Sequence, residues 1–385
     1  MAVGLSPSSM MGVSRYIRPH LAGVGPDARS DPEAYVEFLL DVIRRHRVQV
    51  TFPLTDRVLL TCDLFRDTIT AETRLAAPPS GAIRNVLDKR ANLDTARRLG
   101  IPCPAQFDLG RLEQIPEMIQ EIGFPIVLKN PGPSMDGTRP RAGLDWIVVQ
   151  DEAGLHRHLP AYSGPGAFPL IQQRVTGVSQ NLCCFAIDGE IVAIQQWRDL
   201  RTFRGDSAFR TTTAVSPDLY RYAELMLREL RWEGLAHLEF FVRENDGDVR
   251  YIETNGRPWA SIEGSIAAGW DFPLWMYKFL AYGEVPQAPP STYAIGVKSR
   301  WHYGDLQALG ISLRHGRAAS SRRRSRTAAI IDYLSGFSPT IHSDVFRVAD
   351  PLPELAEHAR GVRMALRGLT RALKRALGAG SGRFR

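Results

Sequence analysis

The chain has 385 residues, of which 44% are hydrophobic and 23% charged, so it can form two or three globular domains. Its longest apolar runs are far shorter than the ~20 residues that cross a bilayer, and its N-terminus lacks the compact apolar stretch of a secretory signal. The net charge of +7 is concentrated from Gly296 onward, where the sequence contains 17 Lys and Arg but only 6 Asp and Glu. We expect a cytoplasmic protein without a transmembrane segment.

The first eighty residues predict alternating helix and strand. Asp31 and Pro32 are typical of an N-cap and of the first residue of a helix. Apolar side chains then recur at helical spacing, which predicts a helix as far as residue 46. The apolar run 48–54 predicts a short strand that ends in a loop. Thr55 and Asp56 follow that strand, at the kind of position where open α/β sheets place binding loops.

The middle of the chain continues with short helices and strands. Two Asp-Gly pairs, at 188–189 and 246–247, each predict a hairpin between neighbouring strands. The sequence PQAPP at 286–290 predicts a linker to a separate C-terminal region. The predicted helices cover 85–99, 115–122 and 218–230, and the predicted strands cover 126–129, 170–173, 182–187, 191–196, 235–242 and 249–254.

Three oxygen-bearing side chains on two of these strands indicate a cation site. Glu239 lies on the strand LAHLEFF, while Glu253 and Asn255 share one face of the next strand, YIETN. Two antiparallel strands would direct all three side chains to one place, which suits Mg²⁺ (or Mn²⁺) with its preference for oxygen ligands. His237 shares the face of Glu239, but no second His or Cys stands at zinc spacing. Either glutamate alone is more often a solvated strand residue.

The segment ETNGRPW resembles the metal-binding end of ATP-grasp enzymes. It is most similar to predicted ATP-dependent carboligases, or carboxylate-amine ligases, whose Glu-x-Asn-Pro-Arg-Phe-Trp pattern this chain departs from at Gly256 and Pro258. The family's Ala-Gly-Val-Asp-Phe-Pro tail corresponds to 268–273, and the ATP-grasp domains of carbamoyl phosphate synthetase and biotin carboxylase are also similar. The resemblance implies an α/β and α+β chain in which two α+β lobes enclose ATP and Mg²⁺ behind a Rossmann-like domain.

The resemblance also assigns nucleotide contacts. Lys89, in VLDKRANLD, and Lys129, at the end of GFPIVLK, match the family's phosphate-binding lysines. The stretch LIQQRVTG matches the hinge whose backbone meets the adenine edge, which would place Gln173, Arg174 and Val175 there. The Gly- and Pro-containing loop at 130–143 would cover the phosphates as a lid.

Arginines supply candidate groups for an anionic substrate. Arg257 follows the metal triad in the family pattern, and four arginines crowd the segment QQWRDLRTFRGDSAFR, where Arg201 is the first choice. Guanidinium groups near an ATP γ-phosphate would orient a carboxylate or stabilise an acyl phosphate. A solvated basic loop is an equally common role for such a segment.

The expected domains are a Rossmann-like pre-ATP-grasp domain at 1–80 that lacks its first β-α unit, an ATP-grasp domain at 81–285 and a basic C-terminal region at 286–385. That region has an amphipathic helix at 353–377, whose leucine face would pack on protein, either this chain or a second subunit, or lie on a membrane. A homo-oligomer is possible. The basic run Arg322–Arg324 has no interleaved aromatic residues, so no nucleic-acid partner is expected.

These residues predict a ligase that uses ATP and Mg²⁺ to activate a small-molecule carboxylate as an acyl phosphate, which an amine or another nucleophile then attacks. Three other functions fit the same sequence: a phosphotransferase, a non-catalytic nucleotide-binding protein and an adaptor that uses the basic C-terminus. The four cysteines, Cys62, Cys103, Cys183 and Cys184, have no metal-site spacing and are expected to be buried thiols.

Overall fold

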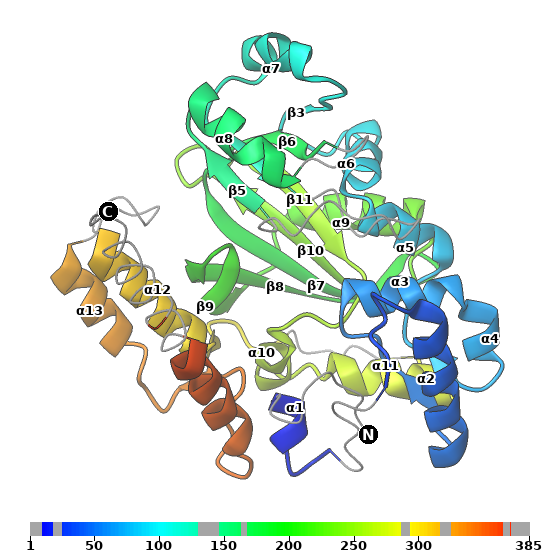
Figure 1. The fold of residues 1–385 in the computed structure, drawn as a ribbon. Coiled ribbons are helices and arrows are strands. Elements are labelled where there is room, and N and C mark those ends of the chain that lie inside the picture. The colour runs from blue at the N-terminus through cyan, green and yellow to red at the C-terminus, as the bar shows by residue number, and fades with distance from the viewer. Residues whose placement is uncertain are drawn as a thin grey trace, which may run out of the picture.

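The computed structural model describes residues 10–17, 25–129, 146–162, 168–285, 293–315, 325–364 and 370. A four-stranded lobe lies above a seven-stranded sheet, with N-terminal helices on one side and the C-terminal helices on the other (Figure 1). This arrangement of two α+β lobes and an α/β segment is the expected fold class. The basic run Arg322–Arg324 and the expected lid at 130–143 lie outside the described residues.

The N-terminal segment packs helices around a short parallel pair of strands. The predicted helix is confirmed as α2 (Pro32–His46), where the backbone N–H of Ala34 donates to Oδ1 of the N-cap Asp31 over 3.0 Å. The predicted strand shortens to β1 (Val50–Thr51), because Pro53 has no N–H with which to continue the ladder. The other elements are α1 (Met10–Val13), α3 (Asp56–Leu64), α4 (Arg66–Thr70) and β2 (Arg74–Leu75), which pairs in parallel with β1.

The predicted helix at 85–99 is two helices, α5 (Ser80–Leu87) and α6 (Lys89–Arg98). Asp88 separates them because its backbone is extended and its side chain accepts hydrogen bonds from the N–H groups of Arg90 and Ala91, which makes it the N-cap of α6. Lys89 is therefore the first residue of a helix and not part of a helix interior.

The upper lobe is a four-stranded antiparallel sheet in the order β3-β6-β4-β5, covered by two helices. The predicted strands 126–129 and 170–173 are confirmed as β4 and β6. Their apolar side chains share one core with the helices, including the fully buried Met118, Ile126 and Leu155. The elements are β3 (Gln106–Phe107), the 3₁₀ helix η1 (Leu112–Gln114), α7 (Ile115–Glu121), β4 (Ile126–Lys129), β5 (Trp146–Val149), α8 (Glu152–Tyr162) and β6 (Leu170–Gln173).

The large sheet has the order β11-β10-β7-β8-β9-β12-β13 and is antiparallel except for its last pair. Both predicted Asp-Gly hairpins are confirmed, and Asp188 and Gly189 both take positive φ between β7 and β8. The strands before the C-terminal region are β7 (Val178–Ile187), β8 (Glu190–Phe203), β9 (Asp206–Thr213), β10 (Gly234–Val242) and β11 (Val249–Asn255). The helices of this part are α9 (Pro217–Glu229), α10 (Ile262–Ala267) and α11 (Phe272–Tyr282).

The residues that follow the PQAPP sequence extend this sheet and do not form a separate unit. β12 (Lys298–Arg300) pairs with β9, and β13 (Ile341–Ser343) pairs with β12. Helices α12 (His302–His315) and α13 (Arg326–Leu334) pack on each other, and α12 lies next to β8 and β9 (Figure 1). A last helix is described over residues 352–364, and most of the predicted helix beyond that point lies outside the described residues.

All four cysteines are free, and three of them are buried, whereas Cys103 is partly exposed. Burial raises the pKa of Cys62 to about 12, so this thiol is uncharged at neutral pH. Among the helices that the structure describes, none combines the length and apolar character needed to cross a membrane.

Candidate active site

Four polar side chains form a patch on one face of β10 and β11. Glu239 lies directly opposite Glu253, and His237 lies opposite Asn255. Asn255 Nδ2 donates to Glu239 Oε1 over 3.0 Å and lies 3.5 Å from Glu253 Oε1. The predicted convergence of the three oxygen-bearing side chains is thus present in the structure.

A β-bulge next to Glu239 makes this patch possible. Glu239 pairs with Glu253, but the next residue, Phe240, pairs with Tyr251, so Ile252 is an extra residue in β11. Regular alternation would place Tyr251 and Glu253 on the same face. The bulge instead leaves Tyr251 fully buried in the core beside Phe240, while Glu253 stays in the polar patch.

The two carboxylates have opposite protonation preferences. Desolvation and the negative charge of Glu253 raise the pKa of Glu239 to about 8. The positive charge of Lys89 lowers the pKa of Glu253 to about 2. Glu253 therefore holds its negative charge more readily than Glu239, because Lys89 lies beside Glu253 and each carboxylate disfavours the charge of the other. Burial and the charge of Arg257 lower the pKa of His237 to about 3, so this imidazole is neutral.

Lys89 reaches the patch from the first turn of α6. Its Nζ lies 3.5 Å from Glu253 Oε2, and the charge of Glu253 raises the pKa of Lys89. The helix is held on β11 by Tyr251, whose hydroxyl donates to Asn92 Oδ1 and contacts Thr254 Oγ1, each over 2.6 Å. This buried chain of hydrogen bonds fixes the helix whose first residue is Lys89.

Lys129 approaches the same patch from the upper lobe. It is the last residue of β4, and its strand partners are Leu170 and Trp146. Desolvation lowers the pKa of Lys129, and the charges of Glu253 and Glu239 act in the opposite direction. The two predicted lysines therefore converge on the two predicted carboxylates from different lobes.

The donor set suits a hard divalent cation. Among the described residues, no group of three or more His, Cys, Asp or Glu forms a ready-made metal cage. Two carboxylates and one amide are present, which is the kind of partial shell that Mg²⁺ completes with waters and substrate phosphates. Glu239, Glu253 and Asn255 therefore fit such an ion by the nature of their donor atoms.

The predicted hinge connects the two lobes. Gln173 ends β6 in the upper lobe, and β7 of the large sheet begins at Val178. The backbone N–H of Gln173 donates to Ala105 O over 2.8 Å and that of Arg174 donates to Pro125 O over 3.2 Å. Both amides are therefore used within the chain. The side chains of Gln173 and Arg174 are exposed and that of Val175 is half-buried.

Arg257 joins the polar patch to the N-terminal segment. Its Nε donates to Asp56 Oδ1 over 2.5 Å, which connects the residue after β11 to the first turn of α3. The substitution of the family's proline by Gly256 fits this contact region, because a Cβ at Gly256 would lie 3.2 Å from Trp232 and 3.3 Å from Pro78. The close approach of the N-terminal segment therefore favours a residue without a side chain.

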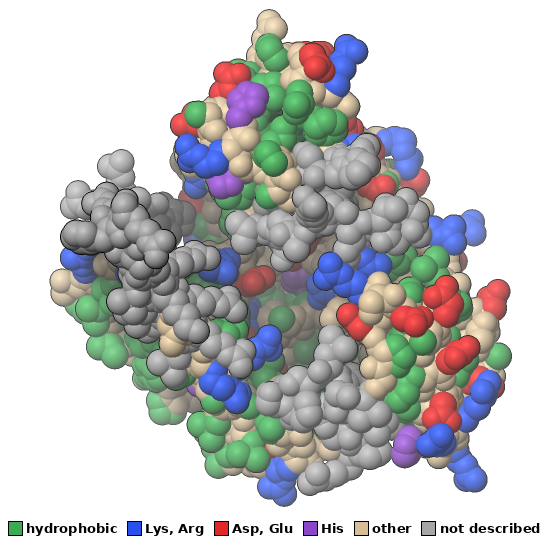
Figure 2. Space-filling model, in the orientation of Figure 1, with side chains coloured by type: hydrophobic (Ala, Val, Ile, Leu, Met, Phe, Trp, Pro, Cys, Tyr) green, Lys and Arg blue, Asp and Glu red, His purple; other side chains and the backbone are tan. Residues whose placement is uncertain are grey.

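Figure 2 shows these surroundings from outside. Basic, acidic and histidine side chains gather in a hollow at the centre of this face, below the upper lobe and beside the N-terminal segment. Glu253, Lys89 and Glu239 have side chains that are 26%, 32% and 33% exposed, so solvent and small ligands have access to all three.

Comparisons with known proteins agree with this architecture. Biotin carboxylase of Campylobacter jejuni, solved as a β,γ-ATP complex, superposes with a TM-score of 0.59 and 17% identity over 74% of this chain and 66% of its own. The ADP complex of N5-carboxyaminoimidazole ribonucleotide synthetase superposes with a TM-score of 0.56 and 13% identity over 87% of this chain and 94% of its own. The chain has the ATP-grasp fold.

A curated relative adds sequence similarity over part of the chain. The carbamoyl phosphate synthase large chain of Vibrio cholerae is 28% identical over 190 residues, which cover 46% of this chain. Those residues make up only 16% of the relative, so this chain spans a small part of that protein's length. No protein-family model matches the chain.

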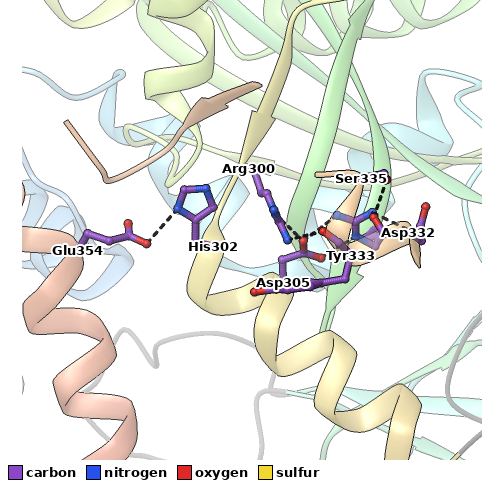
Figure 3. Close-up of polar contacts among 8 residues, drawn as sticks. Arg300, His302, Asp305, Asp332, Tyr333, Ser335 and Glu354 are labelled. Atoms are coloured by element: carbon purple, nitrogen blue, oxygen red, sulfur yellow. Dashed lines mark hydrogen bonds and ion pairs between the residues drawn. The ribbon is translucent and has the colours of Figure 1, made fainter. Parts of the chain in front are cut away.

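Within the ATP-grasp fold, Arg201 is engaged by the C-terminal region. Its Nε and Nη2 donate to the two oxygens of Asp305 over 2.6 and 2.7 Å, and its Nη1 donates to Asp332 O. Arg300 Nε donates to the same carboxylate over 2.6 Å (Figure 3). Because its guanidinium is committed to these groups, the structure supports a structural role for Arg201, and a catalytic role remains only a sequence-based prediction.

The other arginines of that segment lie apart from one another and do not form one basic cluster. The hairpin from β8 to β9 replaces the expected basic loop: Arg198 pairs with Glu244, Arg204 lies at the exposed turn, and Arg210 is buried and pairs with Asp344. Sequence reasoning missed Asp344 and Asp305, and it also missed Asn92 and Tyr251. The last two carry no motif, and only their contact with each other identifies them.

Proposed function

We propose that this chain is an ATP- and Mg²⁺-dependent ligase that joins a small-molecule carboxylate to an amine or another nucleophile. The observation that carries the proposal is the directly paired Glu239 and Glu253, with Lys89 and Lys129 beside them. The two glutamates provide negative charge for a divalent cation. The two lysines, which lie on other elements, provide positive charge for phosphates. The names and bound nucleotides of the structural neighbours are consistent with this chemistry.

Each residue has a distinct task in this proposal. Lys89 and Lys129 would contact the phosphates of ATP as point charges. Glu239, Glu253 and Asn255 would hold Mg²⁺, which neutralises phosphate charge when it is bound. The segment Gln173–Val175 would border the adenine at the junction of the lobes. Transfer of this kind depends on position and charge neutralisation more than on a covalent enzyme group.

The proposed reaction has two steps. A carboxylate oxygen of the substrate attacks the γ-phosphorus of ATP, and the bond to the β,γ-bridging oxygen breaks, which gives an acyl phosphate and ADP. The nitrogen of an amine then attacks the acyl carbon, a proton leaves the nitrogen, and inorganic phosphate departs. The terminal nitrogens of Arg257 would hold the substrate's oxygen atoms during the first step, because a guanidinium fork matches a carboxylate.

The test is a screen for ADP release over pools of carboxylates and amines, with mass spectrometry of the products. Hydroxylamine is added to each pool because it converts an acyl phosphate to a stable hydroxamate. Carboxylate-dependent ADP release with hydroxamate formation supports the ligase. A stable phosphorylated product without hydroxamate would instead identify a phosphotransferase, and ATP binding without ADP release from any pool would contradict both enzymes.

The proposed location is the cytoplasm. Cys183 and Cys184 are adjacent, buried and free, and Cys62 and Cys103 are also free. Free thiols of this kind suit a reducing compartment.

A further inference from the structure

The side chain of Asp56, in the N-terminal segment, contacts the candidate site. Asp56 is the first residue of α3, where the N-cap Thr55 accepts a hydrogen bond from the N–H of Val58 over 3.2 Å. Asp56 Oδ1 accepts the hydrogen bond from Arg257 Nε, and the two residues are 201 positions apart in the sequence. The N-terminal segment thus contacts the residue that the proposed function assigns to the substrate.

This contact leaves the outer edge of the Arg257 guanidinium free. Within the part of the chain that the structure describes, Nη1 and Nη2 of Arg257 have no hydrogen-bond partner, and the side chain is 25% exposed. A guanidinium held by Nε has its plane and direction set, while its two terminal nitrogens can still donate to two oxygens of one anion. The charge of Arg257 acts on His237 and that of Asp56 acts on Lys89, so both residues border the carboxylate patch.

The pair is not needed to attach the N-terminal segment. Val50, Phe52 and Ala76 of that segment share an apolar core with Trp259, Phe272 and Met276 of the ATP-grasp body. The hydroxyl of Tyr277 also donates to Gln49 Oε1 over 2.6 Å. Because Asp56 is 44% exposed, its ion pair with Arg257 adds little to stability compared with this apolar contact.

We propose that Asp56 is a positioning residue that orients the free edge of Arg257 toward an oxyanion bound beside Glu239 and Glu253. The N-terminal segment then contributes to substrate binding without touching the reacting atoms. This inference rests on the proposed function for the nature of the anion, which is a carboxylate in the reactant and inorganic phosphate in the product.

Binding of MgADP with and without inorganic phosphate tests the proposal without a known substrate. Calorimetry on the full chain would measure how much phosphate tightens MgADP binding in the wild type and in the variants Asp56→Ala, Asp56→Glu and Arg257→Ala. Glu72→Gln is the matched control, because Glu72 forms an exposed ion pair with Arg44 within the N-terminal segment. Melting temperatures would show that each variant is folded.

The expected sign separates orientation from simple charge. Removing the negative charge of Asp56 would strengthen phosphate binding if electrostatics alone were at work. Loss of orientation predicts the opposite, so Asp56→Ala, which removes both the charge and the hydrogen-bond acceptor, should weaken the effect of phosphate by about tenfold, the equivalent of one lost hydrogen bond to a charged group. Arg257→Ala should abolish the effect, Asp56→Glu should retain part of it, and Glu72→Gln should not change it.

The possible failures are distinguishable. If the wild type does not bind MgADP, the proposed function itself is wrong. If it binds MgADP but phosphate has no effect on that binding, Arg257 does not present an oxyanion site. If phosphate acts in the wild type and acts equally or more strongly in a folded Asp56→Ala variant, Asp56 does not position Arg257.

Discussion

Lys89 Nζ and Glu253 Oε2 lie 3.5 Å apart, although Lys89 begins α6 and Glu253 lies on β11, far along the sequence. Their contact joins the first turn of α6 to β11 at the candidate metal site. It lowers the pKa of Glu253 and raises that of Lys89, so both groups are charged over the physiological range. Substitution of Glu253 and substitution of Lys89 should therefore have separate effects on the site.

Glu253→Gln should reduce ADP formation at least about 100-fold while the protein remains folded, because it removes a charged group from a phosphate-transfer site without changing its shape. Activity would be measured at saturating Mg²⁺, together with circular dichroism. The control is Glu190→Gln, at the hairpin end of β8, where Glu190 pairs with Arg228. Wild-type turnover in Glu253→Gln would show that the metal assignment is wrong.

Lys129→Ala and Lys89→Ala should each weaken ATP binding by about tenfold or more, because each removes a positive charge from the proposed phosphate contacts. Lys278→Ala is a suitable control, since Lys278 is exposed on α11 and pairs with Glu284. Titration with ATP at fixed Mg²⁺ gives the affinities. An equal loss in the control would indicate nonspecific attraction of ATP to the basic protein.

Asp305→Asn should destabilise the fold by about 3–5 kcal/mol, because it leaves buried guanidinium charge without its carboxylate. The side chains of Asp305 and Arg300, which pair in Figure 3, are 1% and 0% exposed, and Arg201 binds the same carboxylate. Denaturant unfolding measures the loss. Asp332→Asn, at a position that is 30% exposed, should cost clearly less. Similar losses in both variants would contradict a central role for Asp305.

The buried carboxyl group of Asp199 should make the stability of the protein depend on pH. Burial raises the pKa of Asp199 to about 6 from 3.8. Between these values the native state retains a proton that the unfolded chain has released, so stability falls as pH rises through this window and is constant above it.

Asp199→Asn should abolish this part of the pH dependence. The free energy of unfolding of the wild type, relative to the variant, should fall by up to ~3 kcal/mol between about pH 4 and pH 7, since one pKa unit corresponds to ~1.4 kcal/mol. Denaturant unfolding of both proteins across this range checks it. A constant difference between them would show that Asp199 ionises normally.

Deletion of residues 353–385 should lower the melting temperature, because the described part of the last helix packs on the chain's own body. Glu354 lies 3.1 Å from His302, Trp301 Nε1 donates to Glu357 over 2.9 Å, and a Cβ at Gly361 would overlap Tyr303. Each lost hydrogen bond of ~1 kcal/mol corresponds to about 2–4 °C. Differential scanning calorimetry would measure the change.

The two sides of that helix differ in their contacts with the rest of the chain. In the described part the leucine face does not pack on this body, since Leu355 and Val362 are both 60% exposed, and its packing on a second subunit stays a prediction. The side that carries Glu354, Glu357 and Gly361 makes the contacts instead. A deletion that changed only binding to anionic liposomes, with melting temperature and mass unaltered, would contradict packing as the role of this segment.

The local parts of the site could be predicted from the amino-acid sequence alone. Period-two alternation placed Glu253 and Asn255 on one strand face, the Asp-Gly pairs located the hairpins, and apolar runs located β4 and β6. These features depend on neighbouring residues, whose backbone preferences and burial are visible in a short stretch of sequence. The resemblance to ATP-grasp enzymes added Lys89 and Lys129 because they lie in recognisable motifs.

The contacts between groups that are distant in the sequence could not be predicted in this way. The bulge at Ile252, the pairing of Arg257 with Asp56 and the capture of Arg201 by Asp305 all depend on how strands and helices pack across the molecule. An arginine in a sequence has the same charge whether it faces a ligand or a buried aspartate. Only the three-dimensional position of the nearest carboxylate, which can be more than a hundred residues away, settles its role.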